Sequence, residues 1–428
     1  MKRYDKYKPS GIDWIGEVPE HWDLKKIKFC FDVYAGATPK TENPDNWDGD
    51  IVWVTPADYK TEDKFIKGGQ RTITKQGYDS CNTQLVSVGS IIFSKRAPIG
   101  TVALNDVELC TNQGCLSCVP KGTNSTYYYY VMSISTEWFD LLGSGATFKE
   151  ISADNFSNVK LPFPTLAEQE AIAAYLDARC GDIDKVVATQ EKRIALLNEM
   201  KQSIITQAVT QGLNPDVKMK DSGVEWIGMV PEHWEVMKVS WLFSIGSGTT
   251  PSTSRKEYYA EEGTNWLQTG DLNDGHITET SKKITDLALK ECGLTIYPIN
   301  SLVVAMYGAT IGKVGLLDIE TTTNQACCVL YNSKLDYKYA YYAFLADKPN
   351  LLIEAYGGGQ PNISQEKIKH QRIACPPNDE QVEIAEYLDR RCGEIDKQIG
   401  AVTRQIELLR EYKQALITEV VTGKRKVC

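Results

Sequence analysis

One stretch of sequence occurs twice in this chain, at a constant separation of 212 residues. Its first copy covers residues 162–210 and its second covers residues 376–422, and landmarks such as Cys180 and Cys392 keep the same separation. A repeat of this length indicates that each copy builds the same supersecondary structure. We therefore expect the chain to fold as two related halves.

A shorter repeat opens each half. Residues 10–22 read SGIDWIGEVPEHW, and residues 222–234 read SGVEWIGMVPEHW. Glycine and proline set turns in this box, and its two tryptophans are large apolar anchors whose indole N–H groups need acceptors. We interpret His21 and His233 as structural rather than catalytic, because each stands alone between a glutamate and a tryptophan.

The long repeat predicts helices. Each copy begins with EQxxIAxYLD, for which we expect a short helix that Gly181 or Gly393 interrupts before a long helix starts. Along the long helix, apolar residues step by three and four, which is typical of a coiled-coil seam. The seam positions are Ile183, Val187, Ile194, Leu197, Ile204 and Ala208 in the first copy, and Ile395, Ile399, Val402, Ile406, Leu409, Leu416 and Val420 in the second.

Gln190, Lys201 and Lys413 interrupt this seam with polar side chains. A single amphipathic helix of this kind could lie on a globular core. Two copies in one chain favour a pairing of the helices with each other.

Two blocks, residues 23–161 and 235–373, lie between the boxes and the helices. Runs such as VSVGSIIFSK (86–95) and YPINSLVVAMYG (297–308) predict a turn followed by a buried strand, whereas TYYYYVMS (126–133) and KYAYYAFLAD (338–347) predict tyrosine-rich helices that pack on a surface. The fold class expected is α+β, with two pseudo-symmetric mixed α/β domains separated by a pair of long antiparallel coiled-coil-like helices. The expected boundaries are 1–161 for the first box and domain, 162–213 for the first helical spacer, 214–373 for the second box and domain, and 374–428 for the second spacer.

The two blocks share framework motifs, but the loops between these motifs differ in sequence. GATP at 36–39 matches GTTP at 248–251, and TNQ occurs at 111–113 and again at 323–325. Between such points the loops diverge, as TENPDNWDGD does from TSRKEYYAEEG. A common frame with different loops is expected of two related binding modules for different ligands.

Composition limits the partners and the compartment. The net charge is −9, which weighs against a nucleic-acid partner, although a local basic surface can occur on an acidic protein. Twelve cysteines without framework spacing suggest reduced thiols and a cytoplasmic location. The sequence has no apolar run near the ~20 residues that cross a bilayer, and its start has no signal-peptide core.

The sequence contains no complete catalytic or metal-binding motif. The segment GATIGKVG at 308–315 has three residues between its first glycines where a phosphate loop needs four. CLSC at 115–118 has metal-like spacing, but without a second such pair we interpret its cysteines as buried strand residues. The four histidines have no ligand spacing. We expect no catalytic residue, metal site or cofactor in this chain.

Paired helices would act as a ruler. With about 30 residues each from near Asp182 or Glu394 onward, they would span ~45 Å at ~1.5 Å per residue. On a DNA duplex this is about 13 base pairs at ~3.4 Å each, which suits a split recognition site with an unread centre. Pseudosymmetry within one chain would also offer two equivalent docking faces to two copies of a partner.

The boxes, GxTP, TNQ, the EQxxIAxYLD join and the LLxxxKxxxITxxVT helix ends together resemble the specificity (S) subunits of type I restriction-modification enzymes, over nearly the whole chain. The resemblance implies that each block is a target recognition domain for one half of a bipartite, asymmetric site in double-stranded DNA. It implies that the helices set the spacer and bind two methyltransferase (M) subunits, and that motor-nuclease (R) subunits join the complex, which serves phage defence in the prokaryotic cytoplasm. S-adenosylmethionine, ATP and magnesium would then be held by the partner subunits.

Candidate DNA contacts are the polar and basic side chains of the variable loops. Base edges are read by Arg, Lys, Asn, Gln, Ser and Thr, and phosphates by Lys, Arg, Thr and backbone N–H groups. The candidates are Thr38, Lys40, Lys95, Arg96, Thr147 and Lys149 in the first block, and Thr250, Ser252, Arg255, Lys256, Tyr307, Thr310, Lys313, Gln360 and Asn362 in the second. For each one a solvated loop residue is the alternative, and for the shared Asn112-Gln113 and Asn324-Gln325 pairs a structural turn is favoured.

Two other functions stay open at this point. The chain could be a two-lobed enzyme of an unrecognised type, which its activity in isolation would reveal. It could also be a scaffold or peptide-binding protein without a DNA role, which its acidic charge would suit.

Overall fold

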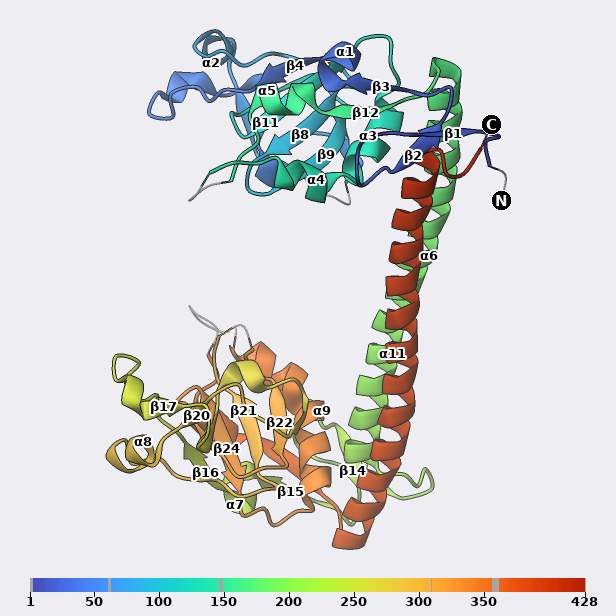
Figure 1. The fold of residues 1–428 in the computed structure, drawn as a ribbon. Helices are drawn as coiled ribbons and strands as arrows, with labels where there is room; N and C mark the ends of the chain where they lie inside the picture. The colour runs from blue at the N-terminus through green and yellow to red at the C-terminus, as the bar shows by residue number, and fades with distance from the viewer. Residues whose placement is uncertain (1–2, 61–62, 146–148, 309, 356–361, 428) are drawn as a thin grey trace. The chain divides into compact units, whose positions relative to one another are not determined.

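The computed structural model describes residues 3–60, 63–145, 149–308, 310–355 and 362–427. The chain forms two compact units: unit 1 consists of Met1–Gln190 with Arg404–Cys428, and unit 2 consists of Glu191–Thr403. Each unit contains a box, a mixed α/β domain and a part of each long helix (Figure 1). The mixed α/β class and the duplication predicted from the sequence are confirmed.

Unit 1 is built on a five-stranded sheet in the order β4-β11-β8-β9-β6. The strands are β4 (Phe31–Ala35), β11 (Cys115–Pro120), β8 (Ile91–Lys95), β9 (Ile99–Asn105) and β6 (Phe65–Ile66). A smaller sheet joins β10 (Leu109–Thr111), β5 (Trp47–Val54) and β7 (Arg71–Ile73), and the helices are α2 (Lys75–Asp79), α3 (Ser125–Ser133), α4 (Thr136–Leu141) and α5 (Ala153–Asn158). Ile91, Ile92 and Phe93 are consecutive and fully buried, because both faces of the sheet are covered.

Unit 2 repeats this topology in the order β16-β24-β21-β22-β19. The strands are β16 (Ser244–Ser247), β24 (Cys327–Tyr331), β21 (Leu302–Ala305), β22 (Val314–Leu317) and β19 (Gly275–Ile277). Its smaller sheet contains β17 (Tyr259–Ala260), β20 (Lys283–Ile284), β18 (Thr264–Leu267) and β23 (Thr322–Thr323), and its helices are α8 (Asp286–Glu291), α9 (Tyr337–Ala355) and α10 (Gln365–His370). The predicted buried strands and tyrosine-rich helices are present in both units.

The boxes form small antiparallel sheets. The first pairs β1 (Tyr7–Pro9) with β2 (Glu17–Pro19), and the second pairs β13 (Met219–Asp221) with β14 (Met229–Pro231). Each box leads into a short strand and a four-residue helix: β3 (Asp23–Lys26) and α1 (Ile27–Cys30), or β15 (Glu235–Lys238) and α7 (Val239–Leu242). β12 (Lys160–Phe163) and β25 (Arg372–Cys375) return at the end of each block to pair with β3 and β15.

The two long helices are continuous. α6 covers Leu166–Gln211 with 46 residues, and α11 covers Asn378–Val421 with 44 residues. The predicted interruptions at Gly181 and Gly393 are therefore wrong, because each long helix begins at Leu166 or Asn378 rather than near Asp182 or Glu394. A glycine in a helix interior costs only about 1 kcal/mol relative to alanine, and the buried cysteines before both glycines hold the helix on its core.

The polar interruptions of the seam find partners on the other helix. In unit 1, the ammonium group of Lys413 lies 2.6 Å from a carboxylate oxygen of Asp184. In unit 2, Lys201 lies 2.7 Å from Asp396. The partner number falls as the residue number rises, so the segments run antiparallel. Val187, Ile395, Val402, Ile406, Leu416 and Val420 are buried seam residues, as predicted.

Each box is fastened to the start of a long helix. Glu168 accepts hydrogen bonds from the indole N–H of Trp22 at 3.2 Å and bonds His21 at 2.9 Å. Glu380 does the same for Trp234 at 2.9 Å and His233 at 2.6 Å. Both histidines therefore make a structural contact of the kind that the sequence indicates.

The end of α11 packs in the core of unit 1, and the end of α6 packs in the core of unit 2. In unit 1 the hydroxyl of Tyr127 donates to the carbonyl of Val421 at 3.2 Å. In unit 2 the hydroxyl of Tyr339 donates to the carbonyl of Val209 at 3.2 Å. Both tyrosines are fully buried, so each domain core depends on a segment from the other half of the sequence. Among the helices within the described ranges, none combines the length and apolar character that a membrane crossing requires.

Candidate DNA interface

Two of the repeated motifs meet at one end of the central sheet in each unit. In unit 1 the amide of Ala37 donates to the carbonyl of Thr111 at 2.9 Å, and the hydroxyl of Thr38 donates to the side-chain oxygen of Gln113. In unit 2 the amide of Thr249 donates to the carbonyl of Thr323 at 3.0 Å, and Thr250 bonds Gln325 in the same way. The GxTP and TNQ loops therefore form one surface.

Glycine and tryptophan explain why this frame is repeated. A Cβ on Gly36 would lie 2.2 Å from the carbonyl oxygen of Asn112, so no other residue fits there without a shift. The indole N–H of Trp53 donates to the carbonyl of Ala37 at 3.0 Å, and Trp266 donates to Thr249 at 3.2 Å. Close backbone approach and two buried indoles fix the loop position.

The asparagine of each TNQ motif is structural. The side-chain oxygen of Asn112 accepts the amide of Gly114 at 2.8 Å, and that of Asn324 accepts the amide of Ala326 at 3.1 Å. These bonds make Asx-type turns. The structural turn favoured from the sequence is thus confirmed for the asparagines.

A third loop, after the central strand, joins the same surface. The amide of Lys95 donates to the carbonyl of Gly114 at 2.9 Å, and the amide of Met306 donates to that of Ala326 at 2.9 Å. Beside these positions Arg96 forms a backbone bridge with Glu150. Tyr307 forms the equivalent bridge with Asn362 in unit 2. The backbones match, whereas the side chains differ in charge and in hydrogen-bonding groups.

In unit 1 the candidate cations of this loop share one carboxylate. Lys95 lies 2.6 Å and Arg96 3.4 Å from the two oxygens of Glu150. The hydrogen bond from Lys95 lowers the pKa of Glu150, although burial opposes the change. Lys149 pairs with Asp140 at 2.5 Å. Lys40 is exposed, and its carbonyl anchors the indole of Trp47 at 3.3 Å.

In unit 2 the candidate Arg255 is held by acidic neighbours. Its guanidinium lies 2.8 Å from Glu257 and 2.7 Å from Glu291, and it also bonds the hydroxyl of Tyr258. The hydrogen bonds to Glu257 and Glu291 raise the pKa of Arg255 further above its usual value. Lys256 is exposed on the same turn, and Lys313 is half-buried beside Thr310, whose carbonyl accepts the Lys313 amide at 3.0 Å.

The remaining candidates divide into three groups. Ser252 bonds Ser254 at 2.8 Å on an exposed loop. The hydroxyl of Tyr307 donates to the carbonyl of Gln325 at 3.0 Å, which brings Tyr307 and Asn362 to the TNQ loop. Thr147 and Gln360 lie outside the described residues.

The sequence matches the family described as type I restriction modification DNA specificity domain twice, over residues 19–198 and 231–404. The chain belongs to this specificity family. It is similar to the type I restriction enzyme MjaIX specificity subunit of Methanocaldococcus jannaschii, with 27% identity over 427 residues that cover 96% of this chain and 95% of that protein. It is also similar to the EcoKI specificity subunit of Escherichia coli K12, with 22% identity covering 95% of this chain and 90% of that protein.

The fold of this specificity chain is shared by a chain from a structure that concerns complex assembly and conformational transition of the type I R-M system. It has a TM-score of 0.71 and 15% identity, and the alignment covers 94% of this chain and 98% of the other. Each family match begins at a box and ends within a long helix, so each domain and the helix that follows it belong to one repeat.

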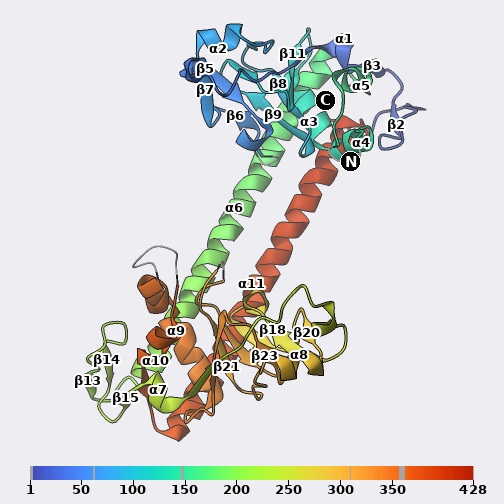
Figure 2. The same ribbon diagram turned by 90° about the vertical axis from the view of Figure 1, so that its left-hand side faces the viewer.

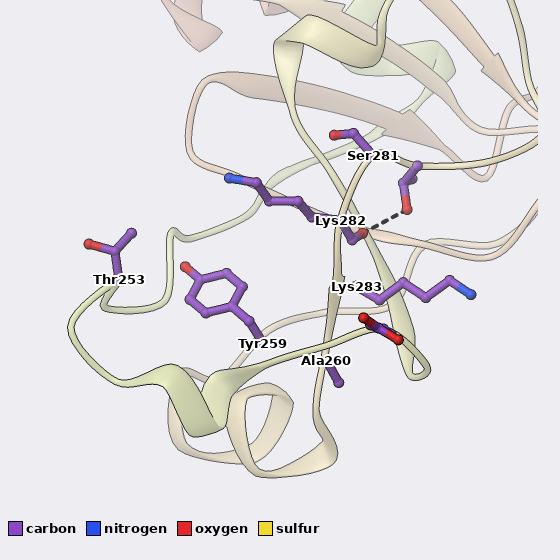
Figure 3. Close-up of a pocket in the computed structure, with 8 residues that line it drawn as sticks. Thr253, Tyr259, Ala260, Ser281, Lys282 and Lys283 are labelled. Atoms are coloured by element: carbon purple, nitrogen blue, oxygen red, sulfur yellow. Dashed lines mark hydrogen bonds between the residues drawn. The ribbon is translucent and has the colours of Figure 1, made fainter. Parts of the chain in front are cut away.

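Sequence reasoning missed a pocket of this specificity chain beside the GTTP loop. It has a volume of about 590 Å³ and is lined by Thr253, Tyr259, Ala260, Glu261, Thr280, Ser281, Lys282 and Lys283. In Figure 3 the ammonium groups of Lys282 and Lys283 extend in different directions, and the Thr280 hydroxyl donates to the carbonyl of Lys282 at 2.8 Å. Tyr259 ties the pocket to the loop, because its hydroxyl donates to the carbonyl of Pro251 at 2.7 Å. The adjacent Lys282 and Lys283 were the sequence feature that could have indicated this pocket.

The CLSC segment lies in β11, where Cys115 and Cys118 are fully buried. Burial raises the pKa of Cys115 to about 12 and that of Cys118 further still. The interpretation of these cysteines as buried strand residues is confirmed. In the described part of the chain, no three His, Cys, Asp or Glu side chains gather as metal ligands would.

Proposed function

We propose that this chain is the DNA sequence-specificity subunit of a type I restriction-modification complex, and that each mixed α/β domain reads one half of a bipartite, asymmetric site. One observation carries the proposal: the same three loops meet in both units, yet the paired positions hold Arg96 and Glu150 in one and Tyr307 and Asn362 in the other. Different base-edge chemistry on one frame is what two different half-sites require.

The reading surface combines base-edge and phosphate groups. Asn362 presents an amide that suits adenine, and Arg96 presents a guanidinium that suits guanine. Lys40, Lys256 and Lys313, together with Lys282 and Lys283 of the pocket, supply charge for the phosphate backbone. These residues also answer the objection from a net charge of −9, because they place cations locally on an acidic chain.

The helices would set the spacer and dock two methyltransferase subunits. Exposed apolar residues support this role: Leu196 and Met200 on α6 recur as Leu408 and Tyr412 on α11, between 47% and 64% exposed. Each pair has i, i+4 spacing, so its two side chains lie together on the helix surface. Apolar positions that recur at a separation of 212 residues suit one partner bound twice.

Chemistry would reside in the partners. Methyltransferase subunits would hold S-adenosylmethionine, and motor-nuclease subunits joined through the complex would use ATP and magnesium, in the prokaryotic cytoplasm. This chain would recognise DNA and assemble the complex without a catalytic residue of its own.

Exchange of one domain tests the proposal. Because β3 pairs with β12, the exchanged segment runs from Asp23 to Phe163, so that this two-stranded sheet moves as a whole. When it is replaced by the equivalent segment of another specificity subunit, methylation profiling of host DNA should show one changed half-site and one unchanged half-site. A change in both halves would contradict the assignment of one domain to one half-site.

Salt-dependent binding provides a second test. The assembled complex should bind duplex DNA with an affinity that falls steeply as salt rises, because cations displace counterions from phosphates. Binding that is absent, or that does not depend on salt, would leave the scaffold interpretation in its place.

A further inference from the structure

A second repeated surface lies away from the reading loops. It consists of Lys26, Phe29 and Lys160 in unit 1, and of Lys238, Trp241 and Arg372 in unit 2, and we call it the aromatic–basic face. In unit 1, α1 lies beside β3 and α5 in both views (Figures 1 and 2), and in unit 2 α7 lies beside β15. Residues of the two copies are 212 positions apart.

An exposed aromatic ring is at the centre of each copy. Phe29 is 63% exposed and Trp241 is 59% exposed, on four-residue helices that bury the residues at either end. The ring differs but the large exposed aromatic is kept, although the loops of the two domains diverge. A single exposed ring needs no explanation, but an exposed ring at equivalent positions of both units favours a role in binding.

Cations without a carboxylate partner lie on the strands beside each short helix. Lys26 lies directly opposite Lys160 across the β3–β12 pair, and Lys238 lies directly opposite Arg372 across the β15–β25 pair. Like charges in this position destabilise a sheet. Within the described ranges none of these four cations pairs with a carboxylate, whereas nearby Lys121 pairs with Asp32 at 2.6 Å.

The cations of unit 1 converge further. The ammonium groups of Lys26 and Lys28 lie 3.1 Å and 2.8 Å from the same amide oxygen of Asn158. A neutral oxygen between two ammonium groups leaves their charge uncompensated. Ser240 stands in unit 2 where unit 1 has Lys28, so only the cross-strand pair of like charges recurs in both units, which is expected where an anionic partner offsets it.

The strand register separates this face from the reading loops. Phe31, next to α1, pairs with Pro120, and Ala35, next to the GATP loop, pairs with Leu116. The amide of Lys121 donates to the carbonyl of Cys30 at 2.8 Å, and the amide of Lys334 donates to that of Leu242 at 3.0 Å. The face therefore lies at the opposite end of β4 and β11, and of β16 and β24, from the loops assigned to DNA.

We infer that the aromatic–basic face is a docking site for a protein subunit bound in two copies, whose surface has an apolar pocket with an acidic rim. Resting on the proposed function, this partner is the methyltransferase subunit, and the face anchors it in addition to the helices. A protein pocket accounts for both the ring and the cations, because buried aromatic anchors carry binding energy and charged rims steer association. A duplex would meet the cations but offers the ring no apolar pocket.

Titration of the full-length chain with the methyltransferase subunit tests the inference. Phe29→Ser should weaken one of the two binding steps roughly tenfold to hundredfold, and Trp241→Ser should weaken the other, as truncation of an aromatic anchor does. The double variant should weaken both steps. Lys26→Glu should slow association and reduce its salt dependence.

Matched controls separate docking from folding. Phe65 is 48% exposed beside Lys64 on β6, at the opposite edge of the central sheet from β4, so Phe65→Ser should bind like the unaltered chain. Phe29→Leu keeps an apolar side chain and should recover most of the affinity, with the thermal unfolding of all variants compared.

Three outcomes would overturn the inference: unchanged affinity in the double variant, loss confined to one of the two copies, or unchanged subunit binding with weaker DNA binding. The last would assign the face to the duplex. The unaltered complex is assayed in parallel for methylation of a two-part site. If the unaltered complex methylates such a site but the double variant binds the subunit normally, this inference fails and the proposed function stands.

Discussion

At the residue scale, the repeats are defined by polar contacts over long sequence separations. Glu168 receives the indole N–H of Trp22 and the ring of His21 from residues almost 150 positions earlier, and Glu380 does the same in unit 2. The sequence indicates that the indoles need acceptors, but it gives no pattern that selects Glu168 among many glutamates. The acceptor is set by the meeting of box and helix, which is tertiary information.

Glu168 should make the stability of unit 1 depend on pH. Burial raises the pKa of Glu168, but hydrogen bonds from His21, Trp22 and Thr165 outweigh it, so the pKa lies below its usual value. A lowered pKa in the folded state stabilises the fold above the unfolded pKa of about 4.3, and this contribution is lost as pH falls through the folded pKa.

Glu168→Ala should lower the free energy of unfolding at pH 7 by about 1–3 kcal/mol, because the buried indole N–H of Trp22 loses its acceptor. Glu168→Gln keeps an acceptor oxygen and should cost less, with a weaker acid dependence. Urea denaturation at pH 7 and pH 4 measures both effects. Glu170→Ala, at an exposed position on the same turn, is the control; an equal loss there would contradict the role of Glu168.

Two candidate cations should behave differently. Lys313→Ala should weaken duplex binding similarly across sequences and reduce the slope of log affinity against log salt by about one, as expected for a phosphate contact.

Arg255→Ala should instead lower the melting temperature, because Arg255 links Glu257 to Glu291 in unit 2. Filter binding at several salt concentrations and thermal melts distinguish the roles. A changed base preference in Arg255→Ala without a change in melting temperature would show that Arg255 reads DNA.

At the element scale, periodicity predicted the helices and failed at their glycines. The seam predicted from Ile183 to Ala208 is right in phase, because core packing enforces the 3.5-residue step. The interruption predicted at Gly181 is wrong, because local propensity is weaker than the burial of Cys180 and the ion pair between Asp184 and Lys413. Ion pairs of this kind on an exposed surface contribute at most about 1 kcal/mol to stability. We therefore assign them chiefly a role in fixing the register of the two helices.

The two helical glycines should be replaceable with a gain in stability. A Cβ at Gly181 or Gly393 would meet no atom within 4 Å. Each change to alanine should therefore raise the free energy of unfolding by roughly 0.5–1 kcal/mol through helix propensity. Gly36→Ala is the opposite control, because its Cβ would lie 2.2 Å from the Asn112 carbonyl oxygen. Denaturation curves of the three variants give their free energies of unfolding. A lower free energy of unfolding for Gly181→Ala would mean that the helix needs flexibility at that position.

At the scale of the whole molecule, duplication explains what the sequence could and could not predict. The separation of 212 residues predicted two units with one topology, and both units have it. It did not predict that each unit takes the end of its second helix from the other half, as Tyr127 with Val421 shows. That exchange follows from the antiparallel pairing that the expected fold included, but no motif in the sequence joins a helix end to the domain core of the other half.

The same exchange determines how the spacer can be altered. Asp184 and Lys201 on α6 are paired with Lys413 and Asp396 on α11, so an insertion into one helix alone would break one of these pairs or bulge the seam. We expect seven residues inserted in both helices, between Asp184 and Lys201 and between Asp396 and Lys413, to keep the phase of the seam. The added length of about 10 Å should widen the unread gap of the DNA site by roughly three base pairs.

Methylation profiling of host DNA measures that gap directly. Both half-sites should be unchanged, because the insertion lies outside the domains that we assign to reading. A single-helix insertion of the same seven residues is the control, and it should lower thermal stability and methylation together because the two helices no longer match in length. An unchanged gap with altered half-sites in the doubly extended chain would show that the helices do not act as the ruler, and that the spacer is set by the domains or by a partner subunit.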